Sequence, residues 1–161
     1  MMKTKRFILV GPAASGKDFM RKRLEARGLT YAVSYTTRPP RDGEVDGKDY
    51  FFISDEVAAQ MIERGEFYEW TRFNDWVYGI TLEQMERDSI FIMTPRVLSK
   101  IKPEDRAESL VFFFDIPEKI RAWRLATREM PGDTPVRRLK ADRADFKNFK
   151  DWDIRISNSD F

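Results

Sequence analysis

The sequence contains no cysteine and no histidine, and each absence removes a class of chemistry. Without cysteine there is neither a disulfide framework nor a thiolate metal site, which fits a cytoplasmic protein. Without histidine there is no histidine-dependent hydrolase triad and no histidine-ligated zinc. Any catalysis must therefore come from lysine, arginine, carboxylates, hydroxyls and backbone amides.

An excess of one charge and long apolar runs are also absent. The 29 Lys and Arg residues face 27 Asp and Glu, and the net charge of +2 argues against a general nucleic-acid-binding protein. The apolar run at residues 7–10 ends at Gly11, too early for a signal peptide, and no run is long enough to span a membrane. From 161 residues we expect one domain, as a monomer or homodimer, with no nucleic-acid or membrane partner.

Short apolar runs alternate with helical patterns along the chain. The runs predict strands at residues 7–10, 31–35, 50–53, 65–73, 76–78, 90–93, 110–114 and 154–156. Helices are expected at residues 17–27, up to Arg64, from Thr81, after Pro95 and Pro117, and at 136–149. This alternation indicates an α/β fold whose parallel core sheet is covered on both faces.

The stretch GPAASGKD, residues 11–18, lies between the first expected strand and helix. It matches the phosphate-loop pattern G-x-x-x-x-G-K, in which backbone N–H groups and the lysine receive phosphate oxygens. Asp18 stands where the pattern has a Ser or Thr that contacts Mg²⁺. We expect Asp18 either to supply negative charge to Mg²⁺, directly or through water, or to cap the helix. The predicted phosphate-binding residues are Gly11, Ala13, Ala14, Ser15, Gly16, Lys17 and Asp18.

A second loop, SYTTRPPRDGEVDGKDY at residues 34–50, carries two arginines on a stretch stiffened by proline. Arg38 and Arg41 flank Pro39 and Pro40, and Tyr50 opens the next expected strand. Two guanidinium groups and a phenol held near one point would bind a phosphate dianion. The alternative is ordinary solvated surface charge.

Together the two loops resemble the guanylate kinase family, which moves the γ-phosphoryl group of ATP onto GMP. The pattern S-Y-T-T-R-P-x-R-x-G-E-x-x-G-x-x-Y-x-F is the most specific part of the resemblance. The resemblance implies a P-loop NTPase three-layer fold with its core at residues 1–33, 81–123 and 150–161. It also implies an NMP-binding insertion of mixed strands at 34–80 and a helical arginine lid at about 124–149. ATP with Mg²⁺ would be the donor, and GMP or dGMP the acceptor.

The resemblance also implies roles for individual residues. Glu69 would accept from the two adjacent N–H donors of guanine, which adenine cannot offer together, and Ser34 would donate to guanine O6. Arg121 and Arg137 are expected on a solvated basic face, and Arg143 matches the lid less well than its neighbours. The implied acceptor residues are Ser34, Arg38, Arg41, Tyr50, Glu69, Tyr78, Gly79 and Thr81; Arg124 and Asn158 would lie near ATP, and Lys17, Arg128 and Arg138 would be catalytic.

The sequence departs from the family pattern at two further places. Thr94, Pro95 and Arg96 stand where members usually carry an acidic pattern, and Ile80 replaces a guanine-reading hydroxyl residue. The G-K-D loop also resembles some viral deoxynucleoside monophosphate kinases and the ribose 1,5-bisphosphate phosphokinases, which lack the full acceptor loop. The alternatives are therefore a phosphokinase for another (d)NMP or for ribose 1,5-bisphosphate, or a catalytically inert binding module.

Overall fold

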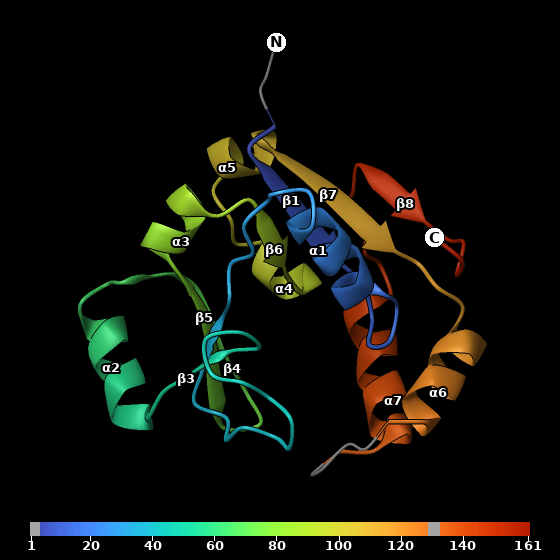
Figure 1. The fold of residues 1–161 in the computed structure, drawn as a ribbon, viewed down its shortest axis with the longest axis horizontal. Helices are drawn as coiled ribbons and strands as arrows, with labels where there is room; N and C mark the ends of the chain where they lie inside the picture. The colour runs from blue at the N-terminus through green and yellow to red at the C-terminus, as the bar shows by residue number, and fades with distance from the viewer. Residues whose placement is uncertain (1–3, 129–132) are drawn as a thin grey trace. The chain divides into compact units, whose positions relative to one another are not determined.

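The computed structural model describes residues 4–128 and 133–161, which fall into two compact units (Figure 1). One unit contains residues 1–29 and 90–161, and the other contains residues 30–89. The second unit is longer than the insertion expected at 34–80, because it begins at Thr30 and extends through helix α3 (Leu82–Arg87).

The first unit is built on a four-stranded sheet with the order β6-β1-β7-β8. All three neighbouring pairs are parallel. Ile8 lies opposite Phe91 and Val111, and all three side chains are fully buried. Such continuous apolar strands occur where a parallel sheet is covered on both faces. The strands are β1 (Arg6–Val10), β6 (Ile90–Ile92), β7 (Ser109–Phe114) and β8 (Ile154–Ile156).

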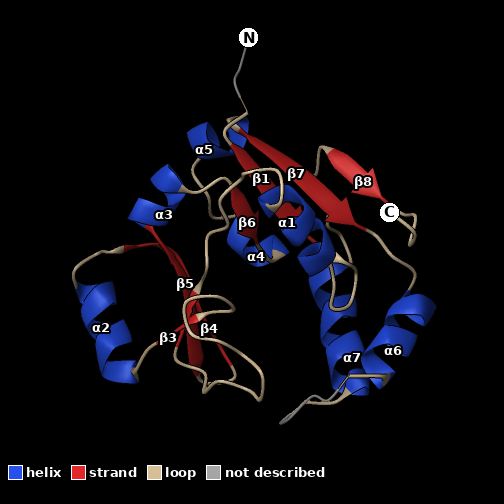
Figure 2. Cartoon of the chain, viewed as in Figure 1, coloured by secondary structure: helices blue, strands red, loops and turns tan. Residues whose placement is uncertain are grey.

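Helices cover both faces of this sheet (Figure 2). Helix α1 (Lys17–Glu25) packs against β1 and β6. On β7, Phe113 stacks on Phe146 of helix α7 (Pro135–Phe146), with 5.8 Å between ring centroids. Because side chains alternate along a strand, its neighbour Phe114 faces the opposite side, where it meets Phe161 at 5.3 Å. The expected three-layer arrangement is confirmed.

Three further helices complete this unit. Helix α6 (Glu118–Ala126) packs along α7, and α4 (Pro95–Leu98) begins at Thr94, whose hydroxyl accepts the Val97 N–H. The sequence pattern does not predict α5 (Pro103–Ala107), although proline at its first position and two acids in its first turn are typical of a helix start.

The second unit has a mixed sheet with the order β3-β2-β5-β4. Its strands are β2 (Tyr35–Thr36), β3 (Phe51–Phe52), β4 (Phe67–Phe73) and β5 (Trp76–Thr81), and helix α2 (Asp55–Glu63) follows β3. The expected strand at 31–35 is wrong in extent. The carbonyl of Val33 accepts the Gln84 amide at 2.6 Å, so this segment bonds to α3 before the strand begins.

The turns of the second unit follow the sequence pattern. Asn74 and Asp75 both have positive φ, 48° and 65°, in the two-residue connection between β4 and β5. Thr81 and Gln84 form the expected capping box at the start of α3. Within the described ranges, no helix has both the length and the apolar character needed to cross a membrane.

Candidate functional site

The glycine loop between β1 and α1 has the backbone of an anion-binding turn. Ala14 and Gly16 are left-handed, with φ of 59° and 101°, and Gly16 caps α1. A left-handed alanine is strained, and such strain is typical of functional loops. Left-handed residues between right-handed ones turn successive N–H groups toward a common point, which suits a phosphate.

Lys17 is held by this loop rather than by an acidic side chain. Its Nζ donates to the carbonyl oxygens of Gly11 at 2.6 Å and Pro12 at 2.9 Å. Burial of the ammonium group lowers the pKa of Lys17 to about 8, although Asp18 and Asp142 act in the opposite direction. At neutral pH the group is therefore still charged, and it lies beside the loop.

A carboxylate that the sequence pattern does not predict also contacts the loop. Asp142, on α7, accepts the backbone N–H of Ala13 at 3.0 Å and an N–H of Arg121 at 3.1 Å through the same oxygen. Burial raises the pKa of Asp142, against the opposing effects of Ala13, Arg121 and Lys17. The only sequence signal is that Asp142 is one of two acids, with Asp145, within a basic helix.

Arg121 is buried, so its expected place on a solvated basic face is wrong. It is 6% exposed, and its Nε donates to the Ile116 carbonyl at 3.0 Å in addition to its bond with Asp142. Arg137, by contrast, is exposed, as expected, and its Nε lies 2.7 Å from a carboxylate oxygen of Asp133. A helical spacing of arginines could not distinguish these two environments.

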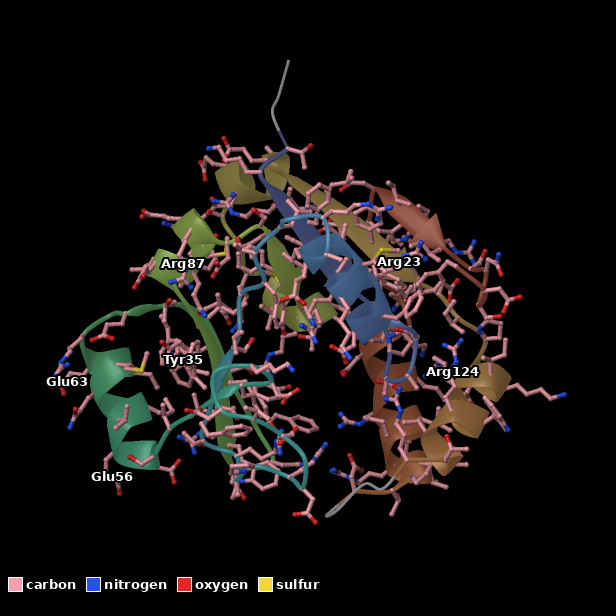
Figure 3. All side chains as sticks on the ribbon, viewed as in Figure 1. Arg23, Tyr35, Glu56, Glu63, Arg87 and Arg124 are labelled. Atoms are coloured by element: carbon pink, nitrogen blue, oxygen red, sulfur yellow. The ribbon has the colours of Figure 1, made fainter. Side chains whose placement is uncertain are left out.

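Arg124 joins α6 to the glycine loop (Figure 3). Its guanidinium donates to the Ala14 carbonyl at 3.0 Å and to the Ser159 carbonyl at 3.2 Å. Asn158, next to Ser159, is exposed, and its side-chain oxygen accepts the Asp160 N–H at 3.0 Å. The structure thus brings Arg124 and the segment that carries Asn158 to the loop.

The remaining arginines of the expected lid differ in their surroundings. The Nε of Arg138 lies 3.4 Å from a carboxylate oxygen of Asp133, which is an ion-pair distance. This buried Nε has no hydrogen-bond partner in the described part of the chain. Arg128 is exposed just beyond the end of α6, and Arg143 is paired with Glu118 at 2.7 Å. Arg138 has a charge interaction with Lys17 and Asp142, so it belongs to the charged surroundings of the loop.

Asp18 projects from the first turn of α1 into solvent. Its side chain is 76% exposed and lies 3.3 Å from Arg21, while the helix cap is Gly16, without a side-chain bond. No group of three acidic side chains that could hold a metal occurs in residues 4–128 and 133–161. Mg²⁺ is commonly bound by one or two carboxylates together with substrate phosphates, so a single Asp18 fits that mode of binding.

In the second unit, the predicted phosphate-binding side chains converge. Arg38 is 5% exposed, and its guanidinium lies over the rings of Tyr50 and Phe52, at 5.3 Å and 5.9 Å. The ring of Tyr78 meets that of Tyr50 at 6.1 Å. Three residues from separate segments therefore form one cluster of a cation and two phenols.

Glu44 holds Arg38 of this cluster in place and also bonds to the backbone of Arg41. One of its oxygens accepts Arg38 at 2.8 Å, and the other accepts the Arg41 backbone N–H at 2.8 Å. Burial raises the pKa of Glu44, but the bonds from Arg38 and Arg41 outweigh it, and the net pKa is lowered. One edge of the Arg38 guanidinium is therefore already occupied. Arg41 is half-buried, and its guanidinium has no ion pair with any described residue.

The residues expected around a purine base lie in the same mixed sheet. Ser34 and Glu69 are both half-buried, and Glu69 lies opposite Ile80, where the β4–β5 register shifts. A Cβ on Gly79 would lie 2.5 Å from the Phe67 ring, so this position requires glycine. The Thr81 hydroxyl accepts the Gln84 N–H at 3.2 Å, which gives Thr81 a capping role.

Comparisons with known proteins agree on one family. The family model described as Guanylate kinase matches residues 3–161. The chain is 32% identical to the guanylate kinase of Geobacter metallireducens over 96% of its length and 81% of that protein. It is 31% identical to that of Malacoplasma penetrans over 98% of this chain and 87% of that protein. The crystal structure of guanylate kinase from Anaplasma phagocytophilum has a similar fold, with a TM-score of 0.71 at 24% identity over 99% of this chain and 80% of that one.

Proposed function

Because this chain belongs to the guanylate kinase family, we propose that it transfers the γ-phosphoryl group of ATP to GMP, and also to dGMP. The observation that carries this proposal is the cluster in which Glu44 fixes Arg38 against Tyr50, with Tyr78 beside it. A buried, oriented guanidinium next to two phenols is suited to a phosphate monoester.

The glycine loop would bind the triphosphate. The N–H groups around Ala13, Ala14, Ser15 and Gly16 offer donors at the start of α1, and Lys17 adds a charge beside them. The Ser15 hydroxyl is buried, with no hydrogen-bond partner in the described residues, and a bound phosphate could supply one. Arg124 and Asn158 would lie toward the nucleoside of ATP.

On the acceptor side, Arg38, Arg41, Tyr50 and Tyr78 would hold the phosphate of GMP. Arg38 has N–H donors left beyond its bonds to Glu44 and Pro39. Glu69 would accept from the N1–H and N2–H groups of guanine, with Ser34 and Gly79 beside the base. Adenine lacks the N1–H donor, so it would leave the carboxylate partly unpaired, which disfavours AMP by about 1–3 kcal/mol.

The reaction itself needs little covalent help from the protein. An oxygen of the GMP phosphate attacks the γ-phosphorus in line, the bond to the bridging oxygen breaks, and ADP leaves with that oxygen. Lys17, Arg128 and Arg138 would stabilise the charge that spreads over the transferred group. Catalysis thus depends on how these cations are positioned.

Mg²⁺ would be held by Asp18, directly or through water, together with oxygens of ATP. Asp18 is exposed in the first turn of α1, adjacent to Lys17, so its carboxylate is available there. When bound, the ion would neutralise charge on the triphosphate. Without it, Asp18 would repel ATP.

An acceptor panel tests the proposed activity. ADP formation from ATP and Mg²⁺ is measured with GMP, dGMP, AMP, CMP, dTMP and ribose 1,5-bisphosphate in separate reactions. Turnover with GMP and dGMP alone is expected. Turnover with the sugar phosphate would assign the chain to a different phosphokinase activity, and no turnover with any acceptor would indicate an inert binding module.

A further inference from the structure

The phosphate loop already contacts an anion from its own chain. The Asp142 carboxylate accepts a hydrogen bond from the backbone N–H of Ala13, a donor that the loop would offer to a phosphate. Its side chain is 11% exposed and lies within electrostatic reach of Lys17, Arg121 and Arg138. A carboxylate oxygen and a phosphate oxygen accept the same N–H donors and attract the same cations. Both therefore compete for this position.

We propose that Asp142 is an internal substitute for a nucleotide phosphate, which a triphosphate must displace from the loop in order to bind. This inference rests on the proposed function, because it concerns the same phosphate loop. It makes Asp142 a residue that limits ATP affinity, in contrast to the cations around it.

Other groups near the loop are also paired within the chain. Lys17 donates to the carbonyls of Gly11 and Pro12, and Arg124 donates to that of Ala14. With Asp142 on Ala13, groups suited to a triphosphate are already paired within the chain. ATP binding therefore exchanges internal bonds for new ones, and its net gain is smaller than the new contacts alone would provide.

The displacement also links the loop to helix α7. Asp142 and Arg138 are four residues apart on α7, so they lie on the same face of that helix. When a phosphate replaces the carboxylate, the attraction that holds α7 to the loop through Asp142 is lost. Arg138 can then be drawn to the phosphate instead. The same helix thus carries both the anion that leaves and a cation that is proposed to act in transfer.

The test compares nucleotide affinities of the intact protein and two matched variants. Asp142→Asn keeps the size of the side chain and removes its charge. Asp145→Asn makes the same change at an exposed position of the same helix. Calorimetric titrations with ATP, ADP and AMP, each in EDTA and in Mg²⁺, give the dissociation constants. We expect Asp142→Asn to bind ATP roughly tenfold more tightly, because a competing charge-assisted bond is removed, whereas Asp145→Asn leaves affinity unchanged.

The pattern across ligands separates competition from other roles. AMP, with one phosphate, should gain less than ATP does. Equal or weaker ATP binding by Asp142→Asn would overturn the inference, and weakening only in Mg²⁺ would do so by assigning Asp142 to metal binding. Failure of the unchanged protein to bind ATP would refute the proposed function instead.

A second pair of variants tests the inference if Asp142→Asn does not fold. Asp142→Asn leaves the buried Arg121 without its carboxylate partner, which can destabilise the fold. In that case Arg121→Gln is compared with the double variant Arg121→Gln/Asp142→Asn, which contains neither buried charge. Tighter ATP binding by the double variant is again expected, and an unchanged affinity would contradict the inference.

Discussion

Replacing Arg38 with lysine isolates what the guanidinium contributes to binding the acceptor phosphate. Arg38→Lys keeps one positive charge but loses the planar group that can donate to Glu44 and to a phosphate at the same time. Arg38 is 5% exposed and has two aromatic rings under it, so its position is already set before GMP arrives. Lysine, with a smaller ammonium group, cannot satisfy both partners from that position.

The expected loss follows from one charge-assisted hydrogen bond. Such a bond contributes about 1.5–3 kcal/mol. Since each 1.4 kcal/mol is about tenfold in affinity, the Kd for GMP should rise by roughly 10- to 100-fold. The charge is retained, so the effect should be at the lower end if the ammonium still reaches the phosphate.

The assay is a titration of GMP and of guanosine, which lacks the phosphate, with a thermal melt of each protein. Arg72→Lys is the matched control, because Arg72 lies exposed on β4, where its guanidinium donates to the Asp75 carbonyl at 3.1 Å. We expect Arg38→Lys to weaken GMP binding and to leave guanosine binding unchanged. Equal weakening of both ligands, or a GMP Kd within about twofold of the unchanged protein, would refute the reasoning.

Three other predictions follow from single positions. Gly79→Ala should lower the free energy of unfolding in urea by about 1–3 kcal/mol, because its Cβ would lie 2.5 Å from the Phe67 ring; unchanged stability would contradict that contact. The pKa of Lys17 is about 8, down from 10.5, so ATP affinity should fall as pH rises through 8, while the nucleotide-free fold gains stability between pH 8 and 10.5, where the unfolded chain holds the extra proton. Titrations at pH 7 and 9 that give the same ATP affinity would argue against this assignment. Asp18→Ser should strengthen ATP binding in EDTA and make binding less dependent on Mg²⁺; an unchanged Mg²⁺ dependence would exclude the metal role.

Local patterns predicted much of the fold. The apolar run at residues 7–10 and the glycines after it correctly indicated β1 and the phosphate loop, because both depend on neighbouring residues. The extent of β2 could not be read in the same way. Its start depends on the Gln84 side-chain amide, which donates to the Val33 carbonyl from 51 positions away.

The candidate site likewise contains residues that local patterns predict and one that depends on a distant contact. Of the four residues expected around one phosphate, which also include Arg41, the structure brings Arg38, Tyr50 and Tyr78 together. The distinctive loop pattern carries Arg38 and Tyr50, so these two could be found from the sequence. Asp142 was missed because it contacts Ala13 across 129 positions, and nothing in a basic helix distinguishes a buried acid from a solvated one. Burial is a property of the folded chain, and charge spacing alone does not encode it.

The Glu44 bond to Arg38 also has a consequence for the entropy of binding. A free arginine samples many rotamers, and ordering it costs on the order of 2 kcal/mol. Here Glu44, the Pro39 carbonyl and two rings restrict those rotamers when the chain folds. The side chain of Arg38 is therefore already ordered before the ligand arrives. Binding of the GMP phosphate to Arg38 should then be driven mainly by enthalpy.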